Sequence, residues 1–503
     1  MNQANLISKL RSFIAAINIR YYFLLLIIAK LLLVYKHFTI LDPDVADQLN
    51  SLYNFMHGKG ISIADFHDNI VHFSPYNYNA SGLVLFLLPL NLLLHNNIMS
   101  VFVLDIIELL FFVLFLYKFM ALLQVEVRLQ KMILLFFAVV QSPFVYNWPA
   151  DSLSMVLCLW GFYFTLKNLY TNKTSDTIAG LLFIGLSYLV KYAYFPYFFF
   201  PFLINVFNNS SLKKENVVKL LKLAALTALA GIVMFLVNYL LVGQRVQDLK
   251  PDGHIHFKNL RYIDGFLFHL GDYETRMGKL LHGPNRFFLI SQVISFFALL
   301  FFTIKIIACH KKAPLKFNKF IALSAGVSVF LILAFLSMLS LLNTPVFFGP
   351  YAPGGHGWTY VIETRYYSPA IILAYLFIII YLFYYCKRWI FISLFVLIGV
   401  INIAAFRSLI LTGTFGEDLG TNLKLQAAFN RNVYLSDPAK KPVVLYDSTT
   451  SSTQEWLMLQ SMGYIYLVDN AGFKAPLRSN EADNFIYLAL RTDSNNNVIL
   501  EKY

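Results

Sequence analysis

Aspartates and histidines gather in residues 41–81, a polar segment that follows the first apolar run of the chain. The segment is LDPDVADQLNSLYNFMHGKGISIADFHDNIVHFSPYNYNAS. We predict that Asp44, with Asp42 second, acts as a general base, because a carboxylate at the lip of an apolar cavity is partly desolvated and can accept a proton from a hydroxyl or amine. The alternative is that one of the two caps the helix that follows Pro43, although the proline between them argues against both being caps.

Basic residues beside apolar runs are candidates for binding a phosphate. Arg365 ends the stretch GPYAPGGHGWTYVIETR, and its guanidinium offers several fixed donors and stays charged when partly desolvated. His356 and Glu363 are placed to share that site. Lys191, at the end of another apolar run, is the second candidate. The alternative for Arg365 is an interfacial arginine among aromatic belt residues.

Three more ionisable residues, Lys30, Asp105 and Glu108, lie within apolar runs. A charge at membrane depth costs roughly 2.5–3.5 kcal/mol on insertion scales, so such groups face a polar cavity or one another. A structural pair between Lys30 and one of the two acids is therefore the default expectation.

The sequence specifies no metal site. Asp151 stands before an apolar run, which favours a helix N-cap ahead of a metal ligand. His254 and His256 have a spacing that strands use for metals, but no third ligand follows from the sequence. A divalent cation, Mg²⁺ or Mn²⁺, stays open as a cofactor. The glycine-punctuated loop that holds these histidines, residues 243–285, is interpreted as a mobile lid.

The composition indicates a polytopic membrane protein. Of the 503 residues, 58% are hydrophobic and only 13% are charged, and the mean hydropathy is +0.61. The net charge of +13 does not indicate nucleic acid, because the basic residues lie between apolar runs instead of on one soluble domain. Many apolar runs have the length of about 18 residues or more that a membrane helix needs.

The fold class expected is an all-α polytopic membrane protein with about eleven transmembrane helices. Gly82–Leu94 is too short for a span and is expected to be re-entrant or interfacial; only then do all the basic connections fall on the side of the basic N-terminus, as the positive-inside rule requires. The expected spans are residues 21–40, 101–120, 134–146, 153–169, 178–191, 195–207, 217–242, 287–307, 320–342, 369–385 and 390–411.

The chain divides into two parts by composition. Residues 1–411 form the transmembrane domain, in which 41–100 is the first external loop with juxtamembrane helices, including an amphipathic helix over residues 45–57. Residues 412–503 are polar and are expected to form a small extracytoplasmic α/β domain, with strands at VVLYD, YIYLVD and FIYLALRT and a helix at SSTQEWLMLQSMG. The N-terminus is expected in the cytoplasm and the protein in the cell inner (plasma) membrane.

The motif PDVADQL, then HGKG and HFSPYNYN before a short apolar helix, resembles the first external loop of the GT-C superfamily of polyprenyl-phosphate-sugar glycosyltransferases. That superfamily includes aminoarabinose transferases and protein O-mannosyltransferases. The resemblance places Asp44 at the family's catalytic acid, with Val45 where a second acid is usual. Residues 74–76 are similar to its Pro-Pro-Leu-Tyr element. The acceptor or substrate contacts expected from the resemblance are His72, Tyr76, Asp151, His356 and Glu363. Asp151 matches an external acidic motif and Arg365 an Arg-Tyr-x-x-Pro motif.

The resemblance implies transfer of a sugar from a polyprenyl-phosphate donor to a lipid, glycan or protein acceptor outside the membrane, with inversion at the anomeric carbon. Membrane lipid is then a partner and nucleic acid is not. One alternative is a lipid-linked glycan transporter or flippase, although two related halves are not detectable. Another is a polysaccharide polymerase or ligase, which would place its arginines and histidines in the loop 243–285.

Overall fold

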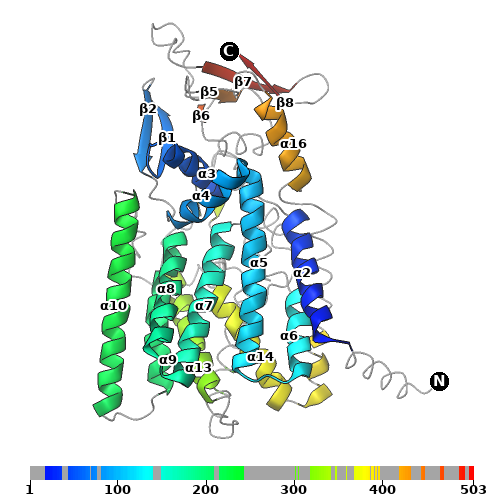
Figure 1. The fold of residues 1–503 in the computed structure, drawn as a ribbon, viewed down its shortest axis with the longest axis vertical. Coiled ribbons are helices and arrows are strands. Elements are labelled where there is room, and N and C mark those ends of the chain that lie inside the picture. Colours follow the sequence, from blue (N-terminus) through cyan, green and yellow to red (C-terminus); the bar gives the residue numbers. More distant parts are fainter. Residues whose placement is uncertain are drawn as a thin grey trace, which may run out of the picture.

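Long helices run side by side in a bundle, and most of the short elements gather at one end of it (Figure 1). We call that end the outer end. The computed structural model describes residues 17–36, 43–67, 70–75, 81–139, 149–208, 214–242, 301, 304, 318–340, 346–347, 358–359, 368–385, 387–389, 391–393, 395–396, 419–431, 443–447, 465–468, 486–492 and 498–502.

The bundle is built from apolar helices that alternate in direction. Of the described helices, α5 and α10 are long and apolar enough to cross a membrane. The closest partners are α7 with α8, α2 with α6, and α9 with α13. The bundle comprises α2 (Ile19–Lys36), α5 (Asn97–Leu122), α6 (Val127–Val139), α7 (Pro149–Thr171), α8 (Thr174–Val190), the 3₁₀ helix η1 (Tyr192–Phe199), α9 (Phe200–Asn208), α10 (Lys214–Val242), α13 (Asn318–Ser340) and α14 (Ser368–Tyr385).

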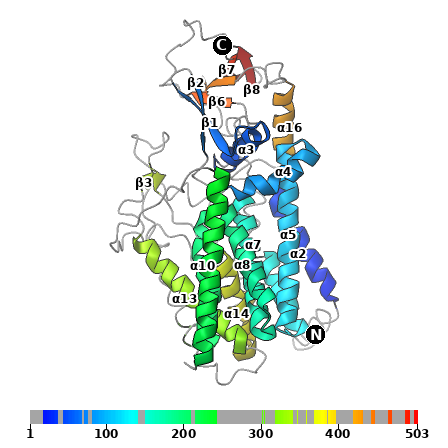
Figure 2. The ribbon, with the colours of Figure 1, turned by 60° about the vertical axis from the view of Figure 1, so that its left-hand side comes forward.

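Two short helices cover the outer end of the bundle. They are α3 (Pro43–Met56) and α4 (Gly82–Leu94), and both lie between the long helices and the strands near the C-terminus (Figure 2). The apolar side of α3 packs into a cluster that we call the outer cluster. Its buried members are Val45, Leu49, Leu52, Ile61, Leu83, Val84, Leu87, Ile98, Val101, Leu104, Ala150, Leu153, Leu157, Val190, Leu419 and Phe429.

The remaining described elements are strands and one more helix. An antiparallel hairpin, β1 (Ser62–His67) and β2 (Ile70–Pro75), follows α3, and β3 (Val346–Phe347) pairs antiparallel with β4 (Trp358–Thr359). Helix α16 (Leu419–Asn430) precedes a sheet of order β6-β5-β7-β8. Its strands are β5 (Val443–Asp447), β6 (Ile465–Val468), β7 (Ile486–Thr492) and β8 (Val498–Lys502); β5 is parallel to β6 and β7, and β8 is antiparallel to β7.

Many of the expected elements are confirmed. Gly82–Leu94 is a helix of 13 residues, well short of the roughly 20 that a span needs. The amphipathic helix expected over residues 45–57 is α3, and the three expected strands of the tail are β5, β6 and β7. The described residues are mostly helical. Spans 287–307 and 390–411, the helix expected over residues 451–463 and the lid 243–285 lie outside the described residues, wholly or for the most part.

Two expectations are corrected. The run 195–207 is not one α-helix but a 3₁₀ helix followed by α9, because Pro196 lacks the amide hydrogen that a continuous α-helix needs there. Asp151 is not an N-cap, since α7 begins at Pro149 and Asp151 lies inside its first turn.

Helix α4 approaches α8 so closely that only glycine fits at its first residue. A Cβ on Gly82 would lie 2.6 Å from the backbone carbon and oxygen of Leu189. We expect Gly82→Ala to destabilise the protein by about 1–3 kcal/mol, because backbone must move to relieve the overlap. Thermal unfolding in detergent measures this. The control is Gly231→Ala on α10, where a Cβ meets only the Phe195 ring at 3.9 Å; equal stability of the two variants would contradict the prediction.

Candidate functional site

A group of ionisable side chains is buried beneath α3 and α4, at the outer end of the bundle. We call it the polar cluster. It consists of Asp105 and Glu108 on α5, Asp151 and Ser152 on α7, and Lys191 directly after α8, and these side chains have exposed fractions between 1% and 8%. Because buried charges are costly unless they are paired, a group of this kind is a candidate functional site.

Contacts between different elements hold the polar cluster together. Lys191 Nζ donates to Asp151 Oδ1 in an ion pair, and Ser152 Oγ donates to Glu108 Oε2. Asp105 Oδ2 and Glu108 Oε1 have no hydrogen-bond partner among the described residues. The cluster thus joins three carboxylates to one ammonium, and two carboxylate oxygens are left without donors.

Chain geometry explains why residues forty positions apart meet here. Helices α7 and α8 run antiparallel and are connected only by residues 172 and 173, so the first turn of α7 faces the last turn of α8. The backbone amide of Lys191 still bonds the Ser187 oxygen, but its φ and ψ of −148° and 117° are extended. The helix therefore ends with the lysine side chain against α7, where Asp151 also lies near the positive end of the α7 dipole.

Helix α3 lies over the polar cluster. Leu104, Ala150 and Val190, which precede Asp105, Asp151 and Lys191 in sequence, belong to the outer cluster together with Val45 and Leu49 of α3. Asp44 is the second residue of this helix.

Further along α3, burial raises the pKa of the Tyr53 phenol above its ordinary value of 10.0, so the hydroxyl stays protonated at neutral pH. Its ring stacks on His57 at 4.0 Å between centroids. The end of α3 away from Asp44 thus carries a stacked aromatic pair.

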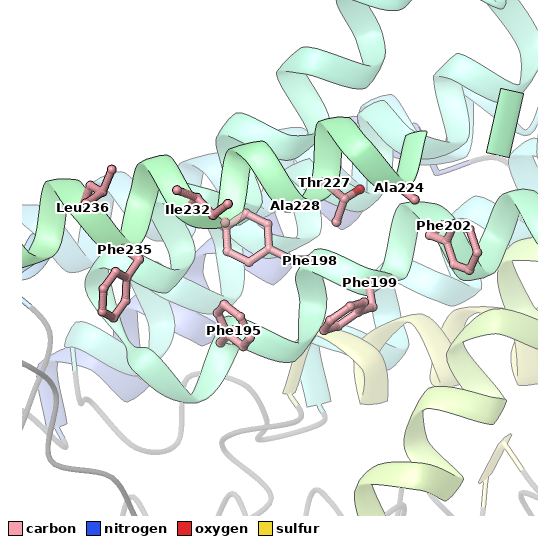
Figure 3. Close-up of a pocket in the computed structure, with 11 residues that line it drawn as sticks. Phe195, Phe198, Phe199, Phe202, Ala224, Thr227, Ala228, Ile232, Phe235 and Leu236 are labelled. Carbon is pink, nitrogen blue, oxygen red and sulfur yellow. The ribbon is translucent and has the colours of Figure 1, made fainter. Parts of the chain in front are cut away.

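An apolar groove of about 570 Å³ runs along α10, opposite η1 and α9 (Figure 3). Phenyl rings from η1 and α9 form one wall, and small residues of α10 leave room on the other. The groove is lined by Phe195, Phe198, Phe199, Phe202, Ala224, Thr227, Ala228, Gly231, Ile232, Phe235 and Leu236. Such a surface suits hydrocarbon and offers almost nothing to a polar ligand.

Hydrogen bonds connect the end of α10 beyond the groove with η1 and with Ser81 before α4. Asn238, two residues beyond the lining residue Leu236, donates from Nδ2 to the Tyr192 hydroxyl at 3.0 Å and accepts from Ser81 Oγ at 3.1 Å. Tyr192 follows Lys191 in the chain. The hydrogen-bonded trio therefore joins the end of α10 beyond the groove to the residue that follows Lys191.

The structure describes four of the nine predicted site residues. Of the nine, Lys191 and Asp151 are brought together as an ion pair. Asp44 is placed by its position in α3, and His72 by its register opposite Asp65 in the hairpin. The other five lie outside the described residues: Asp42, Tyr76, Arg365, His356 and Glu363.

Sequence reasoning missed the connection between α5 and α7. Asp105 and Glu108 stand out as acids in an apolar run, but nothing in the pattern specifies Ser152 and Asp151 as their neighbours. Among the described residues, no group of three or more His, Cys, Asp or Glu side chains is arranged to hold a metal ion. No protein-family model matches the chain, and no curated protein matches it in sequence.

Proposed function

We propose that the chain is a polytopic membrane glycosyltransferase that moves a sugar from a polyprenyl-phosphate donor to an acceptor on the outer side of the membrane. The observation that carries this proposal is the arrangement of α3, Lys191 and the apolar groove. Helix α3, which bears Asp44, packs into the same cluster as Val190, the residue before the buried Lys191, and Tyr192 after that lysine is hydrogen-bonded to Asn238, near the end of the apolar groove. A base, a cation and a hydrocarbon-binding surface are the three features that this reaction requires.

The arrangement of basic residues supports the membrane orientation. Lys118, Arg128, Lys167, Lys173 and Lys214 lie at or near the ends of helices that point away from the strands, as does the N-terminal end of α2 (Figure 1). In the proposed orientation this end faces the cytoplasm, in agreement with the positive-inside rule. The polar cluster then lies toward the opposite side.

In the proposed reaction, the acceptor oxygen forms a bond to the anomeric carbon as the bond from that carbon to the phosphate oxygen breaks. Asp44 takes the acceptor proton, and polyprenyl phosphate leaves with the electron pair. Lys191, together with Arg365, holds the phosphate. An ammonium has three donors, so Lys191 can contact a phosphate oxygen while it remains paired with Asp151. A single displacement inverts the anomeric centre.

A second candidate function is a proton-coupled transporter of a lipid-linked glycan. The observation that favours it is the position of Asp105 and Glu108, which lie one turn apart on α5 with carboxylate oxygens that lack donors in the described structure. Buried acids of this kind mark proton pathways in many transporters. Such a protein would move the donor across the membrane without release of polyprenyl phosphate.

The proposal is tested with the purified chain in lipid nanodiscs and a panel of short-chain polyprenyl-phosphate sugars, by following release of polyprenyl phosphate. We expect release with at least one donor in the presence of membrane extract as acceptor source. Gly231→Phe fills the groove. We expect the donor KM to rise about tenfold or more, because the donor loses apolar contacts that contribute about 1–2 kcal/mol to its binding free energy.

The matched control is Leu240→Phe, on the same helix but with a side chain 79% exposed, which should behave as wild type. Movement of an intact donor across vesicles without its cleavage would favour the transporter instead. Equal KM values for Gly231→Phe and Leu240→Phe would remove the groove from the proposal.

A further inference from the structure

Two polar side chains of α3 are buried without hydrogen-bond partners among the described residues. Gln48 is 1% exposed and Ser51 is 0% exposed, and the atoms concerned are Gln48 Oε1 and Ser51 Oγ. Neither takes part in the reaction proposed above. A buried polar atom that has lost its water and gained no partner destabilises the folded chain, so each such atom calls for a physical explanation.

Another buried polar side chain of α3 has hydrogen-bond partners. Asn54 donates from Nδ2 to Asn50 Oδ1 at 3.0 Å and to the backbone oxygen of Ser62 at 2.8 Å, which fixes α3 against β1. Inadequate packing of the whole helix therefore does not explain the two atoms. The lack of partners is confined to one side of α3.

Helical spacing aligns this side with the proposed base. Asp44, Gln48 and Ser51 occupy positions i, i+4 and i+7, which fall on one stripe of an α-helix. Val45, Leu49 and Leu52 have the same spacing one residue later, and they form the stripe that packs into the outer cluster. The stripe that carries the two atoms is thus adjacent to the packed side and begins at Asp44.

We propose that Gln48 and Ser51 bind hydroxyl groups of a sugar ring, and that they are positioning residues for the saccharide on which Asp44 acts. An amide oxygen accepts and a serine hydroxyl both donates and accepts, which matches the alternating donor and acceptor character of vicinal sugar hydroxyls. This inference rests on the proposed function, because the sugar is the group transferred or its acceptor.

Binding to these covered side chains requires α3 to move, and we place that movement in the turn that follows the helix. Gly58 and Gly60 have φ values of +75° and +70°, and a Cβ at either would have nothing within 4 Å. Glycine is the residue least restricted in backbone conformation, so the connection from α3 to β1 can change shape at low cost. A ligand could thereby reach side chains that are covered when the layer is closed.

The test combines stability and turnover in Gln48→Met and Ser51→Ala. Each replacement removes an unpartnered polar group and keeps most of the volume, so we expect the Tm in detergent to equal or exceed that of wild type. Sugar transfer should fall about three- to tenfold for each lost hydrogen bond, mainly through KM. The matched control is Ser328→Ala on α13, another buried serine whose hydroxyl lacks a partner among the described residues, and its turnover should stay unchanged.

Ligand binding is followed separately by saturation-transfer NMR with methyl glycosides of glucose, mannose, galactose and arabinose. We expect a signal from at least one glycoside that weakens in Gln48→Met and Ser51→Ala but not in Ser328→Ala. If wild type binds a glycoside through these residues yet cleaves no polyprenyl-phosphate sugar, the proposed function is wrong and the binding site stands.

Two results would overturn the inference. One is sugar transfer by Gln48→Met and Ser51→Ala at the wild-type rate and KM, which would leave the proposed function intact. The other is a loss of folding in these variants, because it would show that the two groups stabilise the protein without a ligand.

Discussion

Asp44→Asn is expected to lower the rate of sugar transfer by about 10²–10⁴-fold while donor binding is retained, because the amide cannot accept the acceptor proton. The expected effect is large because Asp44 is the proposed base. It is the second residue of α3, the helix that packs into the outer cluster. Measurements of turnover and of the donor KM in nanodiscs distinguish a loss of the chemical step from a loss of donor binding. Arg365→Ala, measured in parallel, should instead weaken donor binding.

Glu126→Gln provides the control for Asp44→Asn. It makes the same change of carboxylate to amide between α5 and α6, where Glu126 accepts a hydrogen bond from Tyr384, and it lies at the opposite end of the bundle from α3. Wild-type turnover is expected. Full activity of Asp44→Asn would withdraw the base assignment and direct attention to the loop 243–285.

Lys191→Met is expected to destabilise the protein by about 3–5 kcal/mol, because it leaves the Asp151 carboxylate buried without its cation. The neighbourhood makes this worse, since the Glu108 carboxylate already experiences the negative charges of both Asp105 and Asp151. Thermal and denaturant unfolding in detergent measure the loss. Asp151→Leu alone should show a similar destabilisation.

The double variant Lys191→Met with Asp151→Leu separates structure from function. A buried ion pair replaced as a whole by apolar side chains is often neutral or stabilising, so stability should return to near the wild-type value. Sugar transfer should stay low, because the phosphate has lost a cation. A double variant that is both stable and fully active would show that the pair is structural and that Lys191 has no role in donor binding.

Local patterns predicted the elements whose identity depends on their own residues. The length of Gly82–Leu94, the amphipathic spacing in α3 and the β-branched runs of β5, β6 and β7 each carry their own signal. The hairpin β1–β2 was not predicted. Its strands contain Asp65, His67 and His72, which are uncommon in strands, and the pairing depends on the layer around it.

The polar cluster could not be assembled from the sequence for a different reason. Lys191 and Asp151 are each recognisable as charges beside apolar runs, but their contact depends on how α7 and α8 turn back on each other. The link from Ser152 to Glu108 likewise depends on the packing of α5 against α7. Long-range pairing of this kind is a property of the tertiary fold, which periodicity does not encode.

The outer cluster has a consequence for the order of events during synthesis. Val45 and Leu49 are made early, whereas Leu419 and Phe429, which pack into the same cluster, are made several hundred residues later. At about 5–20 residues per second, this interval is tens of seconds. An unfinished chain therefore cannot complete the outer cluster, which closes only after α16 has been translated and has reached the same end of the bundle.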